Sequence, residues 1–257
     1  MEKGESMMIL GGLPRSGITL LASLLNKDAN IYVTTSSPFV EILYRTYSLW
    51  SDPIHQGELD TDNMRNAKIP FLQGMTKEYY KQLTTKTFVI DKRRQWQNVA
   101  NIEMYRAVYG ELPKIICPIR SVPEIITSYK TLYAKNNREW NYEELKDNKF
   151  EASYFDLVEG YKKYPDCFLL VEYDDLVDDT VKTLERVYQF MDLTMPQQEL
   201  GNIESAENEG TYHVLEGLHT LRSTISRDNV RPKDVLTATE LSRFSNMKFW
   251  ETGHVFQ

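Results

Sequence analysis

The sequence predicts an α/β protein, a three-layer sandwich whose central sheet is mainly parallel and is flanked by helices on both faces. Three observations support this prediction. Short apolar runs of strand length alternate with amphipathic segments of helix length. The first of these strands leads through a glycine-containing loop into a helix. The composition, with 41% hydrophobic and 26% charged residues, is that of an ordinary globular protein.

The first half of the chain supplies three predicted strands. Met7–Leu10 is a buried apolar run that stops at a glycine pair, and Thr19–Leu25 follows as a mostly apolar helix. Ile31–Thr34 and Thr87–Asp91 are the second and third strands. This order of strand, loop and helix repeats later in the chain, which favours a parallel sheet.

The chain beyond residue 91 supplies two more strands and three helices. Asn98–Tyr109 has apolar residues at helical spacing and is followed by Gly110, a typical helix stop. In the strand Lys114–Arg120, Pro118 predicts a bulge or an irregular end. Ser121 is the predicted cap of the next helix, with Pro123 near its first position. The last strand and helix are Phe168–Tyr173 and Thr180–Met191.

The length of 257 residues is sufficient for one sizeable core. No repeat, low-complexity segment or Gly/Pro/Ser-rich linker divides the chain, so residues 1–257 are expected to form a single domain. Residues 51–86 are polar with possible short helices, and residues 193–235 are polar and acidic, then basic. Both segments are interpreted either as lids or acceptor-binding insertions or as plain surface connections.

The charge balance and the cysteines limit the function classes. The 30 basic and 37 acidic residues give a net charge of −7, so no nucleic-acid partner is expected, because such binding depends mainly on phosphate neutralisation. Cys117 and Cys167 each lie in an apolar run, which predicts buried thiols in a reducing compartment. No Cys or His cluster has metal-ligand spacing, so no metal is expected.

Nothing in the sequence indicates a membrane-bound or exported chain. No run approaches the roughly 18 apolar residues of a membrane helix. The acidic start lacks the apolar core of a signal peptide. The expectation is a soluble, cytoplasmic protein of unknown oligomeric state.

Four loops follow predicted strands: residues 11–18, 34–41, 91–95 and 120–123. Ligands of open parallel sheets bind outside the carboxyl ends of the strands. These loops are therefore expected to gather at one edge of the sheet and to form the site.

The first of these loops fits a phosphate-binding pattern in part. In G-x-x-x-x-G-K-[ST], Gly12, Gly17 and Thr19 match, but Ile18 stands where the lysine belongs. The loop amides and the helix amino end still form an anion cradle, to which Arg15 adds a positive charge. A ligand with a 5′-phosphate-like group is predicted. The alternative is an ordinary strand-to-helix turn.

This loop also resembles the 5′-phosphosulfate loop of sulfotransferases, which use 3′-phosphoadenosine-5′-phosphosulfate (PAPS) as donor. The family loop usually reads Pro-[Arg/Lys]-Ser-Gly-Thr-Thr, so Ile18 is a single departure that removes one hydroxyl and leaves the backbone cradle. The resemblance implies donor binding by Pro14, Arg15, Ser16, Gly17, Ile18, Thr19 and Leu20.

A second segment, Ile116–Ser128, resembles the family's 3′-phosphate motif. That motif is a strand ending in Arg, a Pro-containing turn, and a helix with Ser eight positions after the Arg. Arg120 and Ser128 match. A guanidinium can grip a phosphate with two hydrogen bonds, and a hydroxyl adds another. The alternative for Arg120 is a structural salt bridge at the strand end.

Three weaker similarities follow the family order. Val89–Lys92 resembles a strand-Asp-Lys segment, and Val171–Val177 resembles an Arg-Tyr-Glu-Asp-Leu segment. Families of this type often close a basic C-terminal loop over the 3′-phosphate and adenine, which implies roles for Arg227, Arg231 and Lys233 beside Arg222. All five similarities together span roughly residues 8–235.

The resemblance implies in-line transfer of a sulfuryl group to a hydroxyl or amine, with 3′-phosphoadenosine-5′-phosphate (PAP) as product and no metal required. Arg15 is the candidate cation at the leaving phosphate, assisted by Lys92, and Ser16 is expected to orient the phosphosulfate. Glu41 is the preferred general base. The alternative for Glu41 is a helix-N-terminal acid stabilised by the helix dipole. The acceptor is a small molecule, glycan, lipid or peptide.

Other basic residues have competing interpretations. The histidines are alternative bases, but each is solitary in a polar stretch and is better interpreted as a surface residue; they are His55, His213, His219 and His254. The run Lys92–Arg94 follows a strand at the expected ligand edge. It is interpreted as electrostatic lining of a polyanion site rather than as a solvated charge run.

Two rival functions stay open. A nucleotide or small-molecule kinase is favoured by Phe88–Asp91, where Asp91 would hold magnesium for ATP, but Ile18 at the lysine position argues against it. A non-catalytic nucleotide-binding module is the second rival. This module would be a degenerate nucleotide-binding fold that has lost its activity, and the presence of Arg15, Arg120 and Glu41 argues against that loss.

Overall fold

The computed structural model describes residues 7–52, 54–59, 61–140, 142–143, 150–197, 200, 225, 230–244 and 248–252. Five strands form one sheet in which every neighbouring pair is parallel. The strand order is β2-β3-β1-β4-β5. The predicted fold class, an α/β sandwich with a parallel sheet, is confirmed. The strands are β1 (Met8–Leu10), β2 (Ile31–Val33), β3 (Phe88–Lys92), β4 (Ile115–Ile119) and β5 (Phe168–Glu172).

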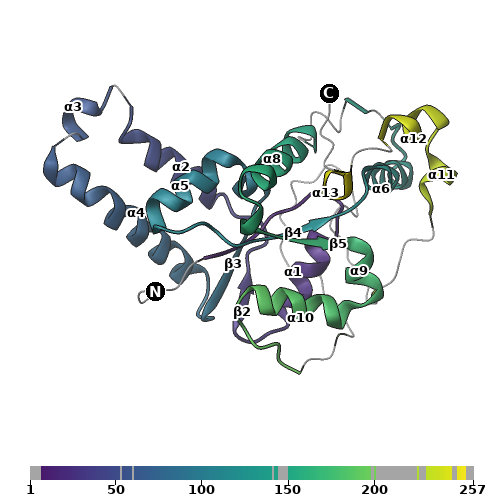
Figure 1. Ribbon diagram of the computed structural model, residues 1–257, viewed down its shortest axis with the longest axis horizontal. Coiled ribbons are helices and arrows are strands. Elements are labelled where there is room, and N and C mark those ends of the chain that lie inside the picture. The colour runs from purple at the N-terminus through teal and green to yellow at the C-terminus, as the bar shows by residue number, and fades with distance from the viewer. Residues whose placement is uncertain are drawn as a thin grey trace.

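Helices cover both faces of this sheet (Figure 1). One face packs α1 (Ile18–Asn26) and α10 (Thr180–Phe190) against Met8 and Leu10. The other face packs further helices against Ile9. Side chains alternate across a strand, so both faces of the central β1 are apolar and buried, as parallel sheets require. The helices of the second face include α2 (Phe39–Leu49), α5 (Val99–Tyr109), α6 (Val122–Lys135) and α8 (Phe150–Lys163).

The connections diverge beside β1. After β1 the chain enters α1 on one face, whereas after the neighbouring β3 and β4 it enters α5 and α6 on the other. Such a divergence opens a crevice at the carboxyl ends of the strands, where ligands of open α/β sheets bind. The loops after β1, β3 and β4 border this crevice.

The polar segment 51–86 is more regular than its sequence predicts. It contains a short helix, α3 (Gln56–Leu59), and a helix of 22 residues, α4 (Asp62–Leu83), that passes through Pro70. Pro70 cannot donate a backbone hydrogen bond, which disfavours a helix interior. Leu72 and Tyr80 are buried on α4, which packs on α2 and α5, and this tertiary packing stabilises the long helix.

The bulge predicted at Pro118 is not observed in β4, whereas Ser121 is confirmed at the N-cap position of α6. The pairing of β4 with β5 runs unbroken from Ile115 to Ile119, without a bulge at Pro118. Pro118 lies beyond the end of β1, so its missing N–H interrupts no ladder on that side. Ser121 occupies the N-cap position of α6, but its hydroxyl donates to Glu124 Oε2 over 2.5 Å and does not cap a backbone N–H.

Several described elements have no counterpart in the sequence-based prediction. The most extensive is α8, which packs against η1 (Arg94–Gln97) and α5. The other predicted helices and strands agree with the structure to within one or two residues. The additional short elements are η2 (Pro165–Cys167), α9 (Tyr173–Asp178), α11 (Pro232–Val235), α12 (Ala238–Phe244) and α13 (Phe249–Thr252).

Candidate active site

The loop between β1 and α1 is held tightly against β4. Gly12 has φ 110°, and a Cβ atom at this position would lie 2.6 Å from the carbonyl oxygen of Pro118. The Leu13 N–H donates to the same oxygen over 3.3 Å. Only glycine satisfies both the positive φ and the close backbone approach. The first glycine of the phosphate-binding pattern is therefore required by the fold.

Gln97 fixes the same loop from the other side, a contact that the sequence did not reveal. Its Oε1 accepts the Gly12 N–H over 2.9 Å, and its Nε2 donates to the Ser153 carbonyl on α8 over 2.7 Å. Gly160 on α8 approaches the Gln97 backbone so closely that a Cβ there would lie 2.2 Å from the Gln97 oxygen. Gln97 thus links the loop to α8.

The amino end of α1 is open to a ligand. Gly17 is its N-cap, with φ 93° and no side chain to satisfy the helix amides. Ile18, Thr19 and Leu20 form the first turn, whose N–H groups have no acceptor within an α-helix. A Cβ at Gly17 would lie 2.9 Å from the Tyr173 ring. These features form the predicted anion cradle.

Arg15 and Ser16 point in different directions. Arg15 has φ 62°, and its Nε donates to Ser128 Oγ on α6 over 3.1 Å. The fully buried Ser16 directs its hydroxyl to the carbonyl oxygens of Leu13 and Pro118, at 2.6 and 2.7 Å. Ser16 therefore braces the loop, while Arg15 joins the two predicted phosphate motifs.

Arg120 lies beside this loop at the end of β4. Its guanidinium stacks 4.0 Å from the Tyr173 ring centroid, and Nη1 donates to the Arg15 carbonyl over 3.4 Å. The side chain is only 10% exposed, and its Nε is 4.0 Å from Glu124 Oε2. Nε is buried and has no hydrogen-bond partner among the described residues. Tyr173 and the Arg15 carbonyl thus orient the Arg120 guanidinium, and its Nε–H can still donate a hydrogen bond.

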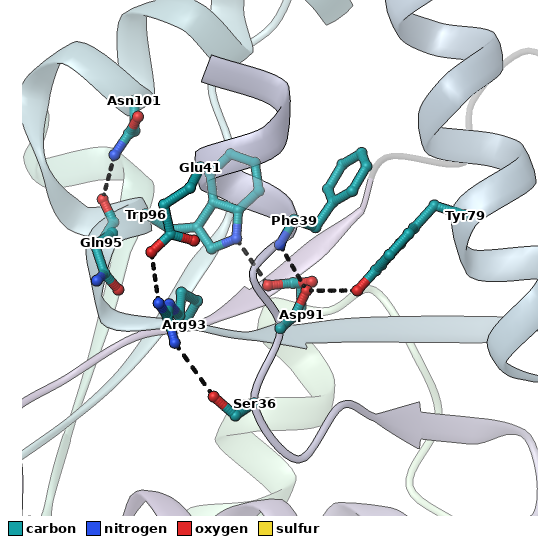
Figure 2. A network of polar contacts seen from close by, with 10 residues as sticks. Ser36, Phe39, Glu41, Tyr79, Asp91, Arg93, Gln95, Trp96 and Asn101 are labelled. Carbon is teal, nitrogen blue, oxygen red and sulfur yellow. Dashed lines mark hydrogen bonds and ion pairs between the residues drawn. The ribbon is translucent and has the colours of Figure 1, made fainter. Parts of the chain in front are cut away.

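Glu41 lies in the first turn of α2, next to a basic residue that follows β3 (Figure 2). Its Oε1 is 2.5 Å from Arg93 Nη2, and Arg93 Nη1 donates to Ser36 Oγ over 3.2 Å. Among the residues described, Glu41 Oε2 has no hydrogen-bond partner although it is buried. Arg93 orients the carboxylate through Oε1 and leaves Oε2 without a partner among the described residues.

Asp91, the magnesium ligand of the kinase hypothesis, is fully buried. Its Oδ2 accepts the Tyr80 hydroxyl over 2.5 Å, and its Oδ1 accepts Trp96 Nε1 over 2.9 Å (Figure 2 shows the Trp96 bond). Burial raises the pKa of this carboxyl, and hydrogen bonds from Ser37, Tyr80 and Trp96 oppose the rise. Both oxygens are occupied inside the core, which argues against a metal-binding role.

The remaining basic candidates lie at different places. Lys92 ends β3, and its backbone N–H donates to Thr34 Oγ1 over 2.8 Å, which places it at the same edge of the sheet. Arg231 and Lys233 are exposed at α11, which packs on α6, and Arg231 Nε contacts Asp234 over 3.1 Å. Arg222 and Arg227 lie outside the described residues.

The histidines do not replace Glu41 in the part of the chain that is described. His55 immediately precedes α3, which lies at the outer end of the arm formed by α2 and α4, away from the sheet (Figure 1). His213, His219 and His254 lie outside the described residues. The described residues also contain no group of three His, Cys, Asp or Glu side chains that could hold a metal. Cys117 and Cys167 are free and buried, as predicted.

The fold and the loop define a parallel α/β protein with a glycine-containing strand–loop–helix unit at the carboxyl edge of its sheet. The family profile described as "Sulfotransferase family" matches residues 8–197. The chain therefore belongs to the sulfotransferase family. No curated protein sequence matches it.

Solved structures agree with this fold. The sulfotransferase domain from the Synechococcus PCC 7002 olefin synthase is 17% identical, with a TM-score of 0.51 and 80% of each chain covered. Mouse sulfotransferase SULT7A1, solved in complex with PAP, is 14% identical, with a TM-score of 0.51; the match covers 96% of this chain and 84% of the mouse chain. In the described part of the chain, no helix is long and apolar enough to cross a membrane.

Proposed function

We propose that this sulfotransferase moves the sulfuryl group of PAPS to a hydroxyl or amine of an acceptor and releases PAP. The observation that carries the proposal is the hydrogen bond between Arg15 and Ser128, which brings the two phosphate motifs together at one edge of the sheet. The mouse relative solved with PAP makes PAP a reasonable ligand to test here.

The donor would lie across this edge. The amides of Ile18, Thr19 and Leu20 and the backbone of Pro14–Gly17 suit the 5′-phosphosulfate, because helix amino ends attract anions. Arg120 and Ser128 suit the 3′-phosphate, and the free hydrogen-bonding capacity of buried Arg120 Nε supports this role. Arg227, Arg231 and Lys233 are proposed to close over the nucleotide.

The fit depends on features of this chain. A Cβ at Gly12 would clash with Pro118 and one at Gly17 with Tyr173, so both glycines are needed to shape the loop. Buried polar atoms of Arg120 and Glu41 lack partners among the residues described. Groups of this kind are costly to bury unless a ligand supplies the missing partner. A donor with two phosphate groups would supply partners for the arginine.

In the proposed reaction Glu41 takes the proton of the acceptor, whose oxygen or nitrogen then bonds to sulfur. The bond between sulfur and the 5′-phosphate oxygen breaks, and the charge that develops on this oxygen meets Arg15 and Lys92. Positioned cations and a positioned base supply most of the acceleration in such transfers. Arg93 orients Glu41 through the 2.5 Å ion pair. Ser16 supports the loop from inside.

The acceptor is proposed to be a small molecule, glycan, lipid or peptide that enters from the Glu41 side. We also propose that residues 1–257 form one domain, in which the segments 51–86 and 193–235 shape the acceptor side. The two free, buried thiols fit a reducing, cytoplasmic compartment.

The test is thermal stabilisation by PAP, by ATP with magnesium, and by AMP. A ligand at about 100 times its dissociation constant should add roughly 2.7 kcal/mol to the free energy of unfolding. PAP should stabilise the wild type, and Arg120→Ala should abolish this shift. Arg186→Ala is the matched control, because Arg186 is an exposed arginine on α10, outside the site. Stabilisation only by ATP with magnesium would refute the donor assignment.

A further inference from the structure

Arg94 is a basic residue at the ligand edge that the resemblance leaves without a role of its own. It opens η1, two residues beyond the end of β3, beside the crevice next to β1. Its neighbour Arg93 pairs with Glu41 and Ser36 on the β2 side. These contacts commit Arg93 to the β2 side of the site.

The guanidinium of Arg94 is largely withdrawn from solvent, and one of its nitrogen atoms is fully buried. Its Nη1 atom has no hydrogen-bond partner among the residues that the structure describes. Burial lowers the pKa of Arg94, as does Arg93, whereas Tyr129 acts in the opposite direction. A buried charge without a partner destabilises a fold, so its retention points to a partner that binds later.

The surroundings of Arg94 indicate where that partner binds. Tyr129 on α6 is 7% exposed and follows Ser128, the residue that accepts the Arg15 hydrogen bond. Burial raises the pKa of Tyr129, and both Arg94 and Arg15 oppose the rise. Both arginines therefore act on the same phenol, and an anion bound beside it would be attracted by both positive charges.

We propose that Arg94 is a donor-binding residue whose guanidinium, together with Arg15, holds the anionic 5′ end of the donor. This inference rests on the proposed use of PAPS. It adds a second arginine to the 5′ site and separates its role from that of Arg93, which serves the carboxylate of Glu41. An arginine suits this position because its planar donors match two oxygens of a phosphate or sulfate at once.

The experiment compares Arg94→Gln, Arg94→Lys and Arg93→Gln in the full chain. Dissociation constants for PAPS, PAP and adenosine 3′-monophosphate are measured by calorimetry without acceptor, and the unfolding temperature is measured without ligand. Arg94→Gln should raise the dissociation constants of PAPS and PAP by about tenfold or more, since it removes a charge-assisted contact. The substitution should change the dissociation constant of adenosine 3′-monophosphate by no more than about twofold, because that ligand lacks the 5′ group.

The remaining variants make the result specific. Arg94→Lys should recover part of the loss, and Arg93→Gln should leave donor binding unchanged. The free Arg94→Gln protein should unfold at the wild-type temperature or above it, because an uncompensated buried charge is removed. The inference is overturned if Arg94→Gln binds PAP with wild-type affinity or loses affinity for all three ligands equally. It is also overturned if the variant unfolds at a lower temperature than the wild type. If the wild type binds no PAP while Arg94→Gln is folded, the proposed function itself fails.

Discussion

Arg15 Nε donates a 3.1 Å hydrogen bond to Ser128 Oγ, although the two residues are 113 positions apart in the chain. One belongs to the loop after β1 and the other to the helix after β4. Since β1 and β4 are adjacent in the sheet, their carboxyl ends bring the two loops together. The proposed donor site is consequently a product of strand order as much as of either motif.

Arg15→Ala should lower the rate of sulfuryl transfer by a factor of about 100 or more, because it removes the cation that meets charge developing on the leaving phosphate. The fold should persist, since Leu13 and Ser16 still attach the loop to β4. Turnover of PAPS and circular dichroism of the variant check both statements. Near-normal turnover would exclude Arg15 from the reaction.

Glu41→Gln should lower the rate by about a hundredfold, as expected when a general base is lost. Nucleotide affinity should stay within about twofold, because the proposed donor contacts do not include Glu41. The matched control is Glu78→Gln, an exposed glutamate on α4. Single-turnover kinetics and PAP binding separate the two effects, and an unchanged rate would assign the base to another residue.

Gly160→Ala should destabilise the protein by about 3 kcal/mol or more, because even one added methyl group overpacks a tightly packed core. The new Cβ would lie 2.2 Å from the Gln97 oxygen. Gly74→Ala on the exposed side of α4 is the control, since its Cβ would meet nothing within 4 Å. Replacing this helical glycine should raise the free energy of unfolding of the protein by about 0.5–1 kcal/mol. Urea unfolding of both variants tests this contrast.

Glu240→Gln should destabilise the protein at neutral pH by roughly 1 kcal/mol. Glu240 on α12 contacts Lys130 on α6 over 3.1 Å. Burial acts to raise the pKa of Glu240, but hydrogen bonds from Thr237 and Lys130 outweigh it, and the net shift is downward from 4.5. The stabilisation is thus present above pH 4.5 and is lost as the pH falls through the lower folded-state pKa.

Urea unfolding at pH 7 and near pH 3 tests this pH dependence. The difference between wild type and Glu240→Gln should shrink at the lower pH. Glu185→Gln, an exposed site on α10, should show no such convergence. Equal differences at both pH values would contradict the prediction.

The sequence predicted the strands well because their signal is local. Runs such as Ile115–Ile119 are apolar over their whole length, and parallel strands buried on both faces require this pattern. The phosphate loop was predictable for the same reason, since Gly12 and Gly17 serve conformations of their own backbone. Failures occurred where packing overrode local preference. Pro70 lies inside a 22-residue helix where only short helices were expected. Ser121 occupies the predicted N-cap position but binds a carboxylate in place of a helix amide.

The sequence by itself determined the alternation of strands and helices, the family and the two phosphate motifs, because each depends on neighbouring residues. The tertiary structure alone decided how the site is assembled. It joined Gly12 to Gln97, placed Asp91 inside the core and paired Arg93 with Glu41. These relationships depend on strand order and on helices packed from distant parts of the chain, which no local pattern of residues encodes.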